Sequence, residues 1–461
     1  MGYMVCSRKE MKIMRNRIER RFRYTKCASL EDKDIAVNIA YMAGKGVFDR
    51  KYIVIFGVNA YTEHIIMNLN KHGFDAWAII DNNSSRAGEH CGNTVVAKPE
   101  DVLETYREDA VILIASRHFD SMSKQLISMG YSRRTQIFQL IDLKMIPIKQ
   151  PRFVSVVPYA LKCRMVYERY RKQWDADTWL FLMPVKGLGD MYFIFGYLLT
   201  YIEKHKIENW RVLAVNKNAV SIGKLFGISN ITIIPVGELR ILNDFGYLVG
   251  YQKAKILCTH WAEKKGELIT NIHKNMPQYA IPFNITYEYA IFGEKTKFTH
   301  PSYQPDRKCI ETAFSTLGLK RGKTVILAPD SNSLVCMKRA AWDAIIEKLK
   351  TAGFSVCTNL TSDKEQPLPG TVGFHFSIED SIAVSEIAGY FIGMRSGLCD
   401  VISNADCKKI FLYTHSVRLK NVEEVFSFRN MEIGKKICEI CVESIKEQDL
   451  ADEIFQKITG M

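Results

Sequence analysis

The sequence lacks the long apolar run that a membrane-spanning helix requires. Its 461 residues contain no stretch of 18 consecutive apolar residues, and the most apolar segment, 192–202, is interrupted by Gly196 and Thr200. The N-terminus is basic and broken by charges where a signal peptide would be apolar. With 28 glycines and 13 prolines, the chain is also too poor in these residues for a collagen-like or linker-rich protein. We therefore expect a cytoplasmic, globular protein.

A disulfide framework and a zinc-binding set are also missing. The 12 cysteines show no framework spacing, so we expect reduced cytosolic thiols. Cys438 and Cys441 form a C-x-x-C pair, but no second pair or nearby histidine completes a zinc site. We expect them to be two half-buried thiols on a helix. Asp175 and Asp177 precede a predicted strand instead of following one, so we interpret them as a cap or turn and predict no metal site.

Acidic residues are scarce relative to basic ones, and the imbalance is concentrated at one end. The formal net charge is +13, and residues 8–26 hold nine Lys or Arg against two Glu. Met11, Met14, Ile18 and Phe22 recur there at helical spacing, which predicts a basic amphipathic helix. Two interpretations stay open, a helix bound to an anionic membrane surface and a helix packed on the protein body. We expect an anionic partner and disfavour nucleic acid.

The rest of the chain alternates between apolar strands and amphipathic helices. Continuous apolar runs at 52–57, 179–185 and 324–329 each open a new series, as expected for strands buried on both faces of a parallel sheet. The fold class predicted is α/β, with three Rossmann-like units. We expect one amphipathic helix over about 442–458. The predicted parts are a basic segment 1–50, an accessory unit 51–150, a helical connector 151–177, an N-terminal lobe 178–305 and a C-terminal lobe 306–461.

The first candidate site follows the strand at 179–185. Lys186, Gly187 and Gly189 form a turn, and Asp190 then falls in the first turn of a helix. Ligands in open parallel sheets bind at the carboxyl ends of strands, where glycines leave room for them. The alternative is that Asp190 only caps its helix.

Two further candidates follow strands of the last unit. Arg395, Ser396 and Gly397 stand between a strand and a helix, where backbone N–H groups, a hydroxyl and a planar cation suit a phosphate. The loop at 329–333 contributes hydroxyl groups, and a lysine follows it. The candidates for binding a diphosphate in this loop and after it are Ser331, Ser333 and Lys338. The alternative is an ordinary turn with solvated basic residues.

These three segments resemble one family, the GT-B glycosyltransferases of the lipopolysaccharide heptosyltransferase type (glycosyltransferase family 9). The resemblance covers about residues 178–430. It rests on Gly189-Asp190 after the first strand, on the segment from Lys338 to Trp342, and on the loop 395–400 after the Ser377–Asp380 segment. Two departures stand out, because Arg395 replaces the family's Asp and Asp400 replaces its His.

The resemblance implies a fold and an activity. The last two units would form a GT-B pair of lobes, and Asp190 would be the catalytic base of an inverting transfer that needs no metal or other cofactor. A nucleotide-diphosphate sugar would be the donor, with Lys338, Arg395, Ser396 and Gly397 holding its diphosphate. The acceptor would be a bacterial cell-surface glycan or a lipid-linked molecule at the inner membrane face. The sugar, the nucleotide, the acceptor and the oligomeric state stay open.

The first unit carries a candidate second site. Gly57 follows its first strand, and Asp81 lies 24 residues later, where a ribose-binding acid is expected. However, Asn59 and Thr62 stand where a dinucleotide fingerprint has glycines. Two rivals to an active glycosyltransferase therefore stay open, an NAD(P)-dependent oxidoreductase or epimerase acting on nucleotide-sugars through 51–145 and an inactive GT-B scaffold.

Overall fold

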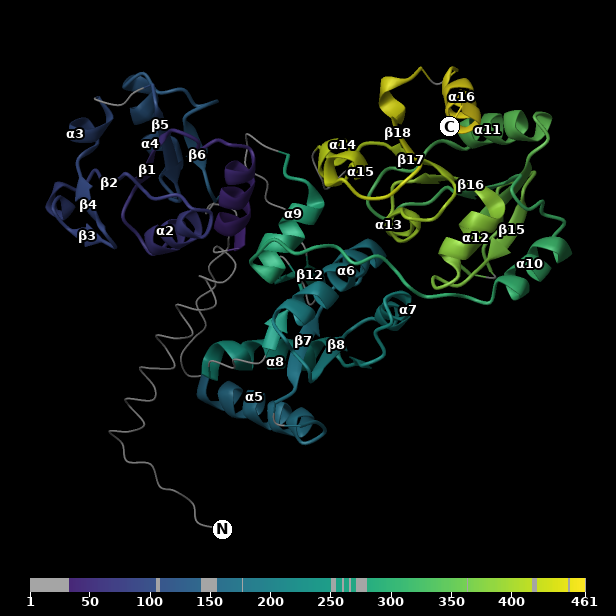
Figure 1. Cartoon of the computed structure of the whole chain (residues 1–461), viewed down its shortest axis with the longest axis horizontal. Helices are drawn as coiled ribbons and strands as arrows, with labels where there is room; N and C mark the ends of the chain where they lie inside the picture. Colours follow the sequence, from purple (N-terminus) through teal and green to yellow (C-terminus); the bar gives the residue numbers. More distant parts are fainter. Residues whose placement is uncertain are drawn as a thin grey trace, which may run out of the picture.

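The computed structural model of the chain describes most of its length (Figure 1). The described residues are 33–104, 108–141, 156–175, 177–249, 254–258, 261–264, 267–270, 280–362, 364–416, 421–446 and 448–460. The basic segment 8–26, for which the sequence predicts an amphipathic helix, lies outside these ranges.

The first domain is a six-stranded sheet with strand order β3-β4-β2-β1-β5-β6. Its strands are parallel except for the β3–β4 pair. Its elements are β1 (Tyr52–Phe56), α2 (Thr62–Lys71), β2 (Ala78–Ile80), a 3-10 turn (Ser84–Arg86), β3 (His90–Cys91), β4 (Thr94–Ala97), α3 (Pro99–Leu103), β5 (Ala110–Ile114), α4 (Phe119–Ser128) and β6 (Ile137–Gln139). A helix over residues 33–44 adds Ile35, Ile39 and Met42 to the core of this sheet. The domain therefore begins by residue 33, within the segment 1–50 that the sequence analysis set apart.

The middle lobe has a four-stranded parallel sheet with strand order β10-β7-β8-β9. Its elements are α5 (Val156–Arg171), β7 (Trp179–Met183), α6 (Leu188–Lys204), β8 (Trp210–Ala214), α7 (Asn218–Leu225), β9 (Ile231–Ile233), α8 (Val236–Val249), β10 (Ala254–Ile256), the hairpin β11 (Trp261–Lys264) and β12 (Glu267–Thr270), α9 (Phe283–Tyr287) and a π-helical turn (Glu288–Phe292). The connector expected at 151–177 is α5, which covers the outer face of this sheet through Tyr170 and Val166.

The C-terminal lobe has a six-stranded parallel sheet with strand order β15-β14-β13-β16-β17-β18. Its elements are α10 (Arg307–Thr316), β13 (Thr324–Ala328), α11 (Arg339–Thr351), β14 (Ser355–Leu360), β15 (Val372–His375), α12 (Ser381–Ala388), β16 (Gly389–Met394), α13 (Gly397–Ile402), β17 (Lys408–Tyr413), α14 (Val422–Val425), α15 (Phe428–Met431), β18 (Ile437–Cys441), a 3-10 turn (Val442–Ser444) and α16 (Leu450–Gly460). The α/β fold class is thus confirmed, with three sheets that are parallel apart from the β3–β4 pair.

The end of the chain differs from the sequence prediction. The segment 442–458 is not one helix, because a 3-10 turn precedes α16, which begins only at Leu450. Cys438 and Cys441 are half-buried as expected, but they lie on the edge strand β18 and not on a helix. The alternation of this strand is weak, since only Ile440 among its five residues is fully buried.

The three parts of the chain are in contact through buried apolar side chains. The middle and C-terminal lobes share one hydrophobic cluster, which includes a contact between Phe283 and Phe426 with ring centroids 4.8 Å apart. The first domain joins the middle lobe through Val37, which packs against Ile281 and Ala290. The site described below therefore lies within a continuous body.

Candidate functional site

The two later sheets each have their first strand at a point where the strand order reverses. In the middle lobe, β7 lies between β8 and β10, and in the C-terminal lobe β13 lies between β14 and β16. Ligands of open α/β sheets bind outside the carboxyl ends of the strands at such points. The loops that leave β7, β13 and β16 are 184–187, 329–338 and 395–396. All three sequence candidates thus lie at or beside the expected ligand-binding edges of their sheets.

Asp190 lies in the first turn of α6 and is held from two sides. Tyr287, at the end of α9, donates a hydrogen bond from its hydroxyl to the Asp190 carboxylate. A Cβ atom at Gly187 would lie 2.2 Å from the Asp190 Oδ2 atom, so only glycine leaves space for this carboxylate. The Tyr287 side chain is fully buried, and burial together with the charge of Asp190 raises its pKa well above the ordinary value. Tyr287 therefore keeps its proton and remains a donor.

The end of β10 lies beside Asp190. The pKa of the Cys258 thiol is raised to about 11, mainly by burial; the charge of Lys33 lowers it, and the charge of Asp190 contributes to raising it. The Lys33 Nζ atom donates to the Cys258 carbonyl oxygen at 2.9 Å. A lysine of the first domain thus reaches the strand end next to the candidate site.

The middle and C-terminal lobes touch at two glycines. A Cβ atom at Gly397 would lie 2.6 Å from the Gly189 nitrogen, and a Cβ atom at Gly189 would lie 2.1 Å from the Asp400 Oδ2 atom. Neither position can hold a side chain unless its neighbours move. The N-terminal turn of α6, which carries Asp190, therefore meets the start of α13, where Ser396 is the N-cap residue. The structure therefore brings the turn that carries Asp190 close to the loop 395–397, and the charge of Asp190 helps to raise the pKa of Asp400.

Arg395 is buried and does not present its cation to a ligand, contrary to the sequence prediction. Its guanidinium is 6% exposed and forms a two-pronged ion pair with Asp400, at 2.6 and 3.0 Å. It also donates to the Phe426 carbonyl oxygen and lies over the Phe428 ring. Burial raises the pKa of Asp400 to about 6 although Arg395 opposes the shift, so the carboxylate is ionised at neutral pH. Arg395 thus stabilises the loop instead of offering a free cation to a phosphate.

The other predicted diphosphate ligands have different surroundings. The Ser331 hydroxyl donates to the Arg395 carbonyl oxygen at 2.9 Å, which joins the loops that follow β13 and β16. Ser333 and Lys338 are exposed, Ser396 is half-buried, and Lys338 is the N-cap of α11. Lys186 is exposed, and its carbonyl oxygen accepts from the Asn216 amide. The structure therefore gathers Ser331, Arg395 and Ser396, while Ser333 and Lys338 face solvent beside them.

In the candidate second site of the first domain, the Asp81 carboxylate already forms hydrogen bonds within the domain. Gly57 has a left-handed φ of +100° after β1, which favours glycine. The Asp81 carboxylate accepts the backbone N–H groups of Val58 and Asn83, both at 2.7 Å. Asp81 thus ties the loops after β1 and β2 together, and ribose binding there stays a prediction.

One residue and one contact of the site could not be predicted from the sequence. Tyr287 lies 97 residues from Asp190 in an aromatic segment, so no local spacing pointed to it. The ion pair of Arg395 with Asp400 was also missed, although both residues had been noted as departures from the resembled family. Five residues separate them, which is not a spacing that places side chains on one helical face.

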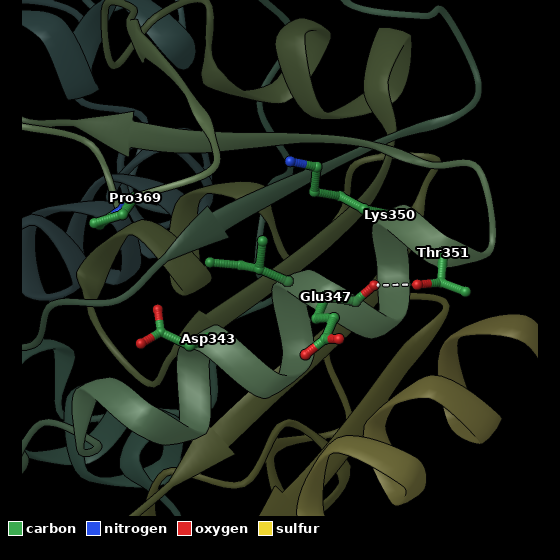
Figure 2. A pocket seen from close by; sticks show the side chains of 6 residues that line it. Asp343, Glu347, Lys350, Thr351 and Pro369 are labelled. Atoms are coloured by element: carbon green, nitrogen blue, oxygen red, sulfur yellow. Dashed lines mark hydrogen bonds between the residues drawn. The ribbon is translucent and has the colours of Figure 1, made fainter.

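Other binding features are few in the described part of the chain. No group of three or more His, Cys, Asp or Glu side chains gathers there at metal-binding distances. None of the helices within the described ranges is long and apolar enough to cross a membrane. A surface groove runs along α11 next to Pro369 (Figure 2), and Thr351 there donates to the Glu347 carbonyl oxygen at 2.8 Å. None of the candidate site residues lines this groove.

Comparison with family models finds one match, in the first part of the chain. A family described as "C2185-like, N-terminal" matches residues 49–137, which lie within the first domain. A search of curated proteins finds no match.

Comparison with solved structures finds glycosyltransferases. ADP-heptose LPS heptosyltransferase II of E. coli is 10% identical, with a TM-score of 0.43 over 61% of this chain and 99% of that one. A glycosyl transferase family 9 protein from Veillonella parvula is 9% identical, with a TM-score of 0.42 over 62% of this chain and 97% of that one. The iron-containing dodecameric glycosyltransferase TibC of enterotoxigenic E. coli is 15% identical, with a TM-score of 0.32 over 51% and 57%.

These glycosyltransferases are solved structures to which the chain is similar. All three TM-scores are below 0.5 and the sequence identities are low. The function proposed below accordingly rests on the residues of this chain.

Proposed function

We propose that the chain is a glycosyltransferase that moves a sugar from a nucleoside-diphosphate sugar to an acceptor hydroxyl. The observation that carries this proposal is the carboxylate of Asp190, which accepts a hydrogen bond from Tyr287 and belongs to the helix turn that meets the loop at 395–397. A held carboxylate opposite the polar loops of a second Rossmann-like lobe is suited to displacement chemistry, because the reacting groups need not be ordered during the reaction.

In this mechanism, Asp190 accepts the proton of the acceptor hydroxyl while that oxygen bonds to the anomeric carbon. The bond between this carbon and the diphosphate breaks, and its electron pair leaves with the nucleoside diphosphate. A single displacement inverts the anomeric centre. The residues proposed to hold the diphosphate are Ser331, Ser333, Lys338, Ser396 and Gly397.

Arg395 has a different role in the proposal than the resemblance implied. Its ion pair with Asp400 fixes the turn from β16 into α13, so it orients Ser396 instead of binding phosphate. Charge on the leaving group would be stabilised by Lys338 and backbone N–H groups, and we propose that transfer needs no metal or other cofactor. Unchanged activity in the presence of a chelator tests this, whereas loss of activity that an added metal ion restores would contradict it.

The proposed acceptor is a bacterial cell-surface glycan or a lipid-linked precursor. We place the reaction in the cytoplasm at the inner face of the membrane. The basic composition of residues 8–26 supports this location, because nine cations attract an anionic surface.

The experiment that tests the function begins with the donor. A thermal-shift panel of nucleoside diphosphates, nucleotide-sugars, NAD and NADP identifies the ligand, because a ligand of the folded state raises its midpoint. Asp190→Asn is then compared with Asp175→Asn, which changes an exposed aspartate of the same lobe. We expect Asp190→Asn to abolish transfer with donor binding retained, and Asp175→Asn to remain active.

Two outcomes would contradict the proposal. Unchanged turnover by Asp190→Asn would remove this residue from the mechanism. Stabilisation by NADP alone would favour an oxidoreductase that uses Gly57 and Asp81.

A further inference from the structure

Helix α5 presents two large apolar side chains to solvent. Leu161 is 60% exposed and Met165 is 74% exposed, more than any other large apolar side chain among the described residues. They are four residues apart, so they lie next to each other on one face of the helix. Isolated exposed apolar residues are common on protein surfaces, but an adjacent pair on an otherwise charged helix face requires explanation.

The core does not need these two side chains. Cys163, Val166, Tyr167 and Tyr170 recur at helical spacing and turn toward the middle lobe, where the last three pack against β7 and β8. Leu161 and Met165 lie on the opposite face. Figure 1 shows α5 on the outer side of the middle lobe, remote from α13.

Cations surround the apolar pair. Lys162 and Arg164 are exposed on α5, and Lys172 is exposed in the turn directly after it. The structure shows no ion pair for these three within the described residues. Arg169 is engaged by Glu238 at 2.6 Å, and Glu168 is the one exposed acid of this face within α5. We name the outer face formed by Leu161, Lys162, Arg164, Met165 and Lys172 the α5 patch.

We propose that the α5 patch docks on an anionic lipid bilayer. A bilayer surface offers negative headgroups to the cations and an acyl boundary to Leu161 and Met165, the two components of interfacial helix binding. This proposal does not depend on glycosyl transfer, and its test measures no transfer.

The alternatives fit the charges and the area less well. A second copy of the chain, or the segment 8–26 with its nine cations, would bring positive charge against positive charge. The surface area that two side chains on one helix can bury is also far less than the roughly 800 Å² per partner of a stable protein interface. Since one such patch binds weakly, the α5 patch and the segment 8–26 together would provide the two signals that stable anchoring requires.

The test uses the full chain and phosphatidylcholine vesicles with or without phosphatidylglycerol, in a flotation assay. The variant Leu161→Gln/Met165→Gln keeps the charges, and Lys162→Gln/Arg164→Gln/Lys172→Gln keeps the apolar pair. The control, Met67→Gln, changes a side chain that is 48% exposed on α2. We expect each α5 variant to bind anionic vesicles about tenfold more weakly than the wild type, with an unchanged unfolding midpoint. Met67→Gln should bind like the wild type.

A second measurement separates α5 from the segment 8–26. Brominated lipids should quench the additional fluorescence of Met165→Trp on anionic vesicles, but not that of Met67→Trp. The proposal is overturned if Met165→Trp is not quenched, if neutral vesicles bind equally well, or if both α5 variants bind like the wild type. If the α5 variants lost binding to an acidic polypeptide while their binding to vesicles stayed intact, the partner would be a protein and the membrane proposal would be refuted.

Discussion

Gly189→Ala is the sharpest perturbation of the contact between the middle and C-terminal lobes. The added Cβ atom would lie 2.1 Å from the Asp400 Oδ2 atom, whereas real Cβ contacts below 3.0 Å essentially never occur. The carboxylate, or the turn that bears Gly189, must therefore move by about 0.9 Å. The added atom would also lie 3.3 Å from the Gly397 Cα atom, so a simple shift of the backbone toward α13 is blocked.

The cost depends on which group moves. Asp400 is held by Arg395 at 2.6 and 3.0 Å in a pair that is only about 5% exposed. Forcing an atom into a filled site costs about 1–3 kcal/mol, and breaking a buried ion pair costs about 3–5 kcal/mol. We expect Gly189→Ala to lower the free energy of unfolding of the two lobes by about 2–4 kcal/mol.

The assay is urea unfolding followed by circular dichroism and fluorescence. The matched control is Gly237→Ala, because Gly237 lies at the start of α8 and a Cβ atom there meets nothing within 4 Å. We expect the control to change stability by less than about 0.5 kcal/mol. If Gly189→Ala unfolds at the same urea concentration as Gly237→Ala, the glycine contact between the lobes is not as close as described.

Three further predictions concern other buried polar groups. Tyr287→Phe should lower the kcat of transfer far more than it changes the KM for the sugar donor, because Asp190 loses its hydrogen bond while the packing stays. Equal effects on kcat and KM would refute a positioning role for Tyr287. Burial raises the pKa of Glu288 to about 7, so the folded state holds this proton more tightly, and stability should fall as pH rises from about 4.5 to 7. Denaturant midpoints of Glu288→Gln should fall less over this range than those of the wild type, and parallel curves would contradict this. Lys409 is fully buried and donates to two backbone carbonyls. Lys409→Met should therefore lower the free energy of unfolding in urea by about 1–3 kcal/mol, and unchanged stability would contradict this.

The sequence predicted the central strands because their signal is strong and local. The apolar runs at 52–57, 179–185 and 324–329 became β1, β7 and β13, the strands at which each sheet reverses its order. A strand covered on both faces must be apolar at every position, and few other structures require this. The position of Asp190 could be predicted for the same reason, since it follows one of these strands.

What the sequence did not reveal depends on contacts between distant residues. Nothing near Tyr287 indicates that its hydroxyl reaches Asp190, because the approach is made by the packing of α9 on α6. Arg395 carries the expected cation, but the extended backbone of Ser396, with φ −151° and ψ 174°, starts a turn that brings Asp400 back to it. The edge strand β18 has the charged Glu439 at its centre and only one buried residue, so its apolar signal is weaker than that of a central strand.

The junction at Val37 has a practical consequence for anyone preparing shortened versions of this protein. A fragment that starts at residue 178 would keep Ile281 and Ala290 but lose the side chain that now shields them, along with the cation that caps the Cys258 carbonyl. Newly exposed apolar surface beside an uncapped strand end promotes aggregation during expression. The two later lobes are thus better produced with the first domain still attached.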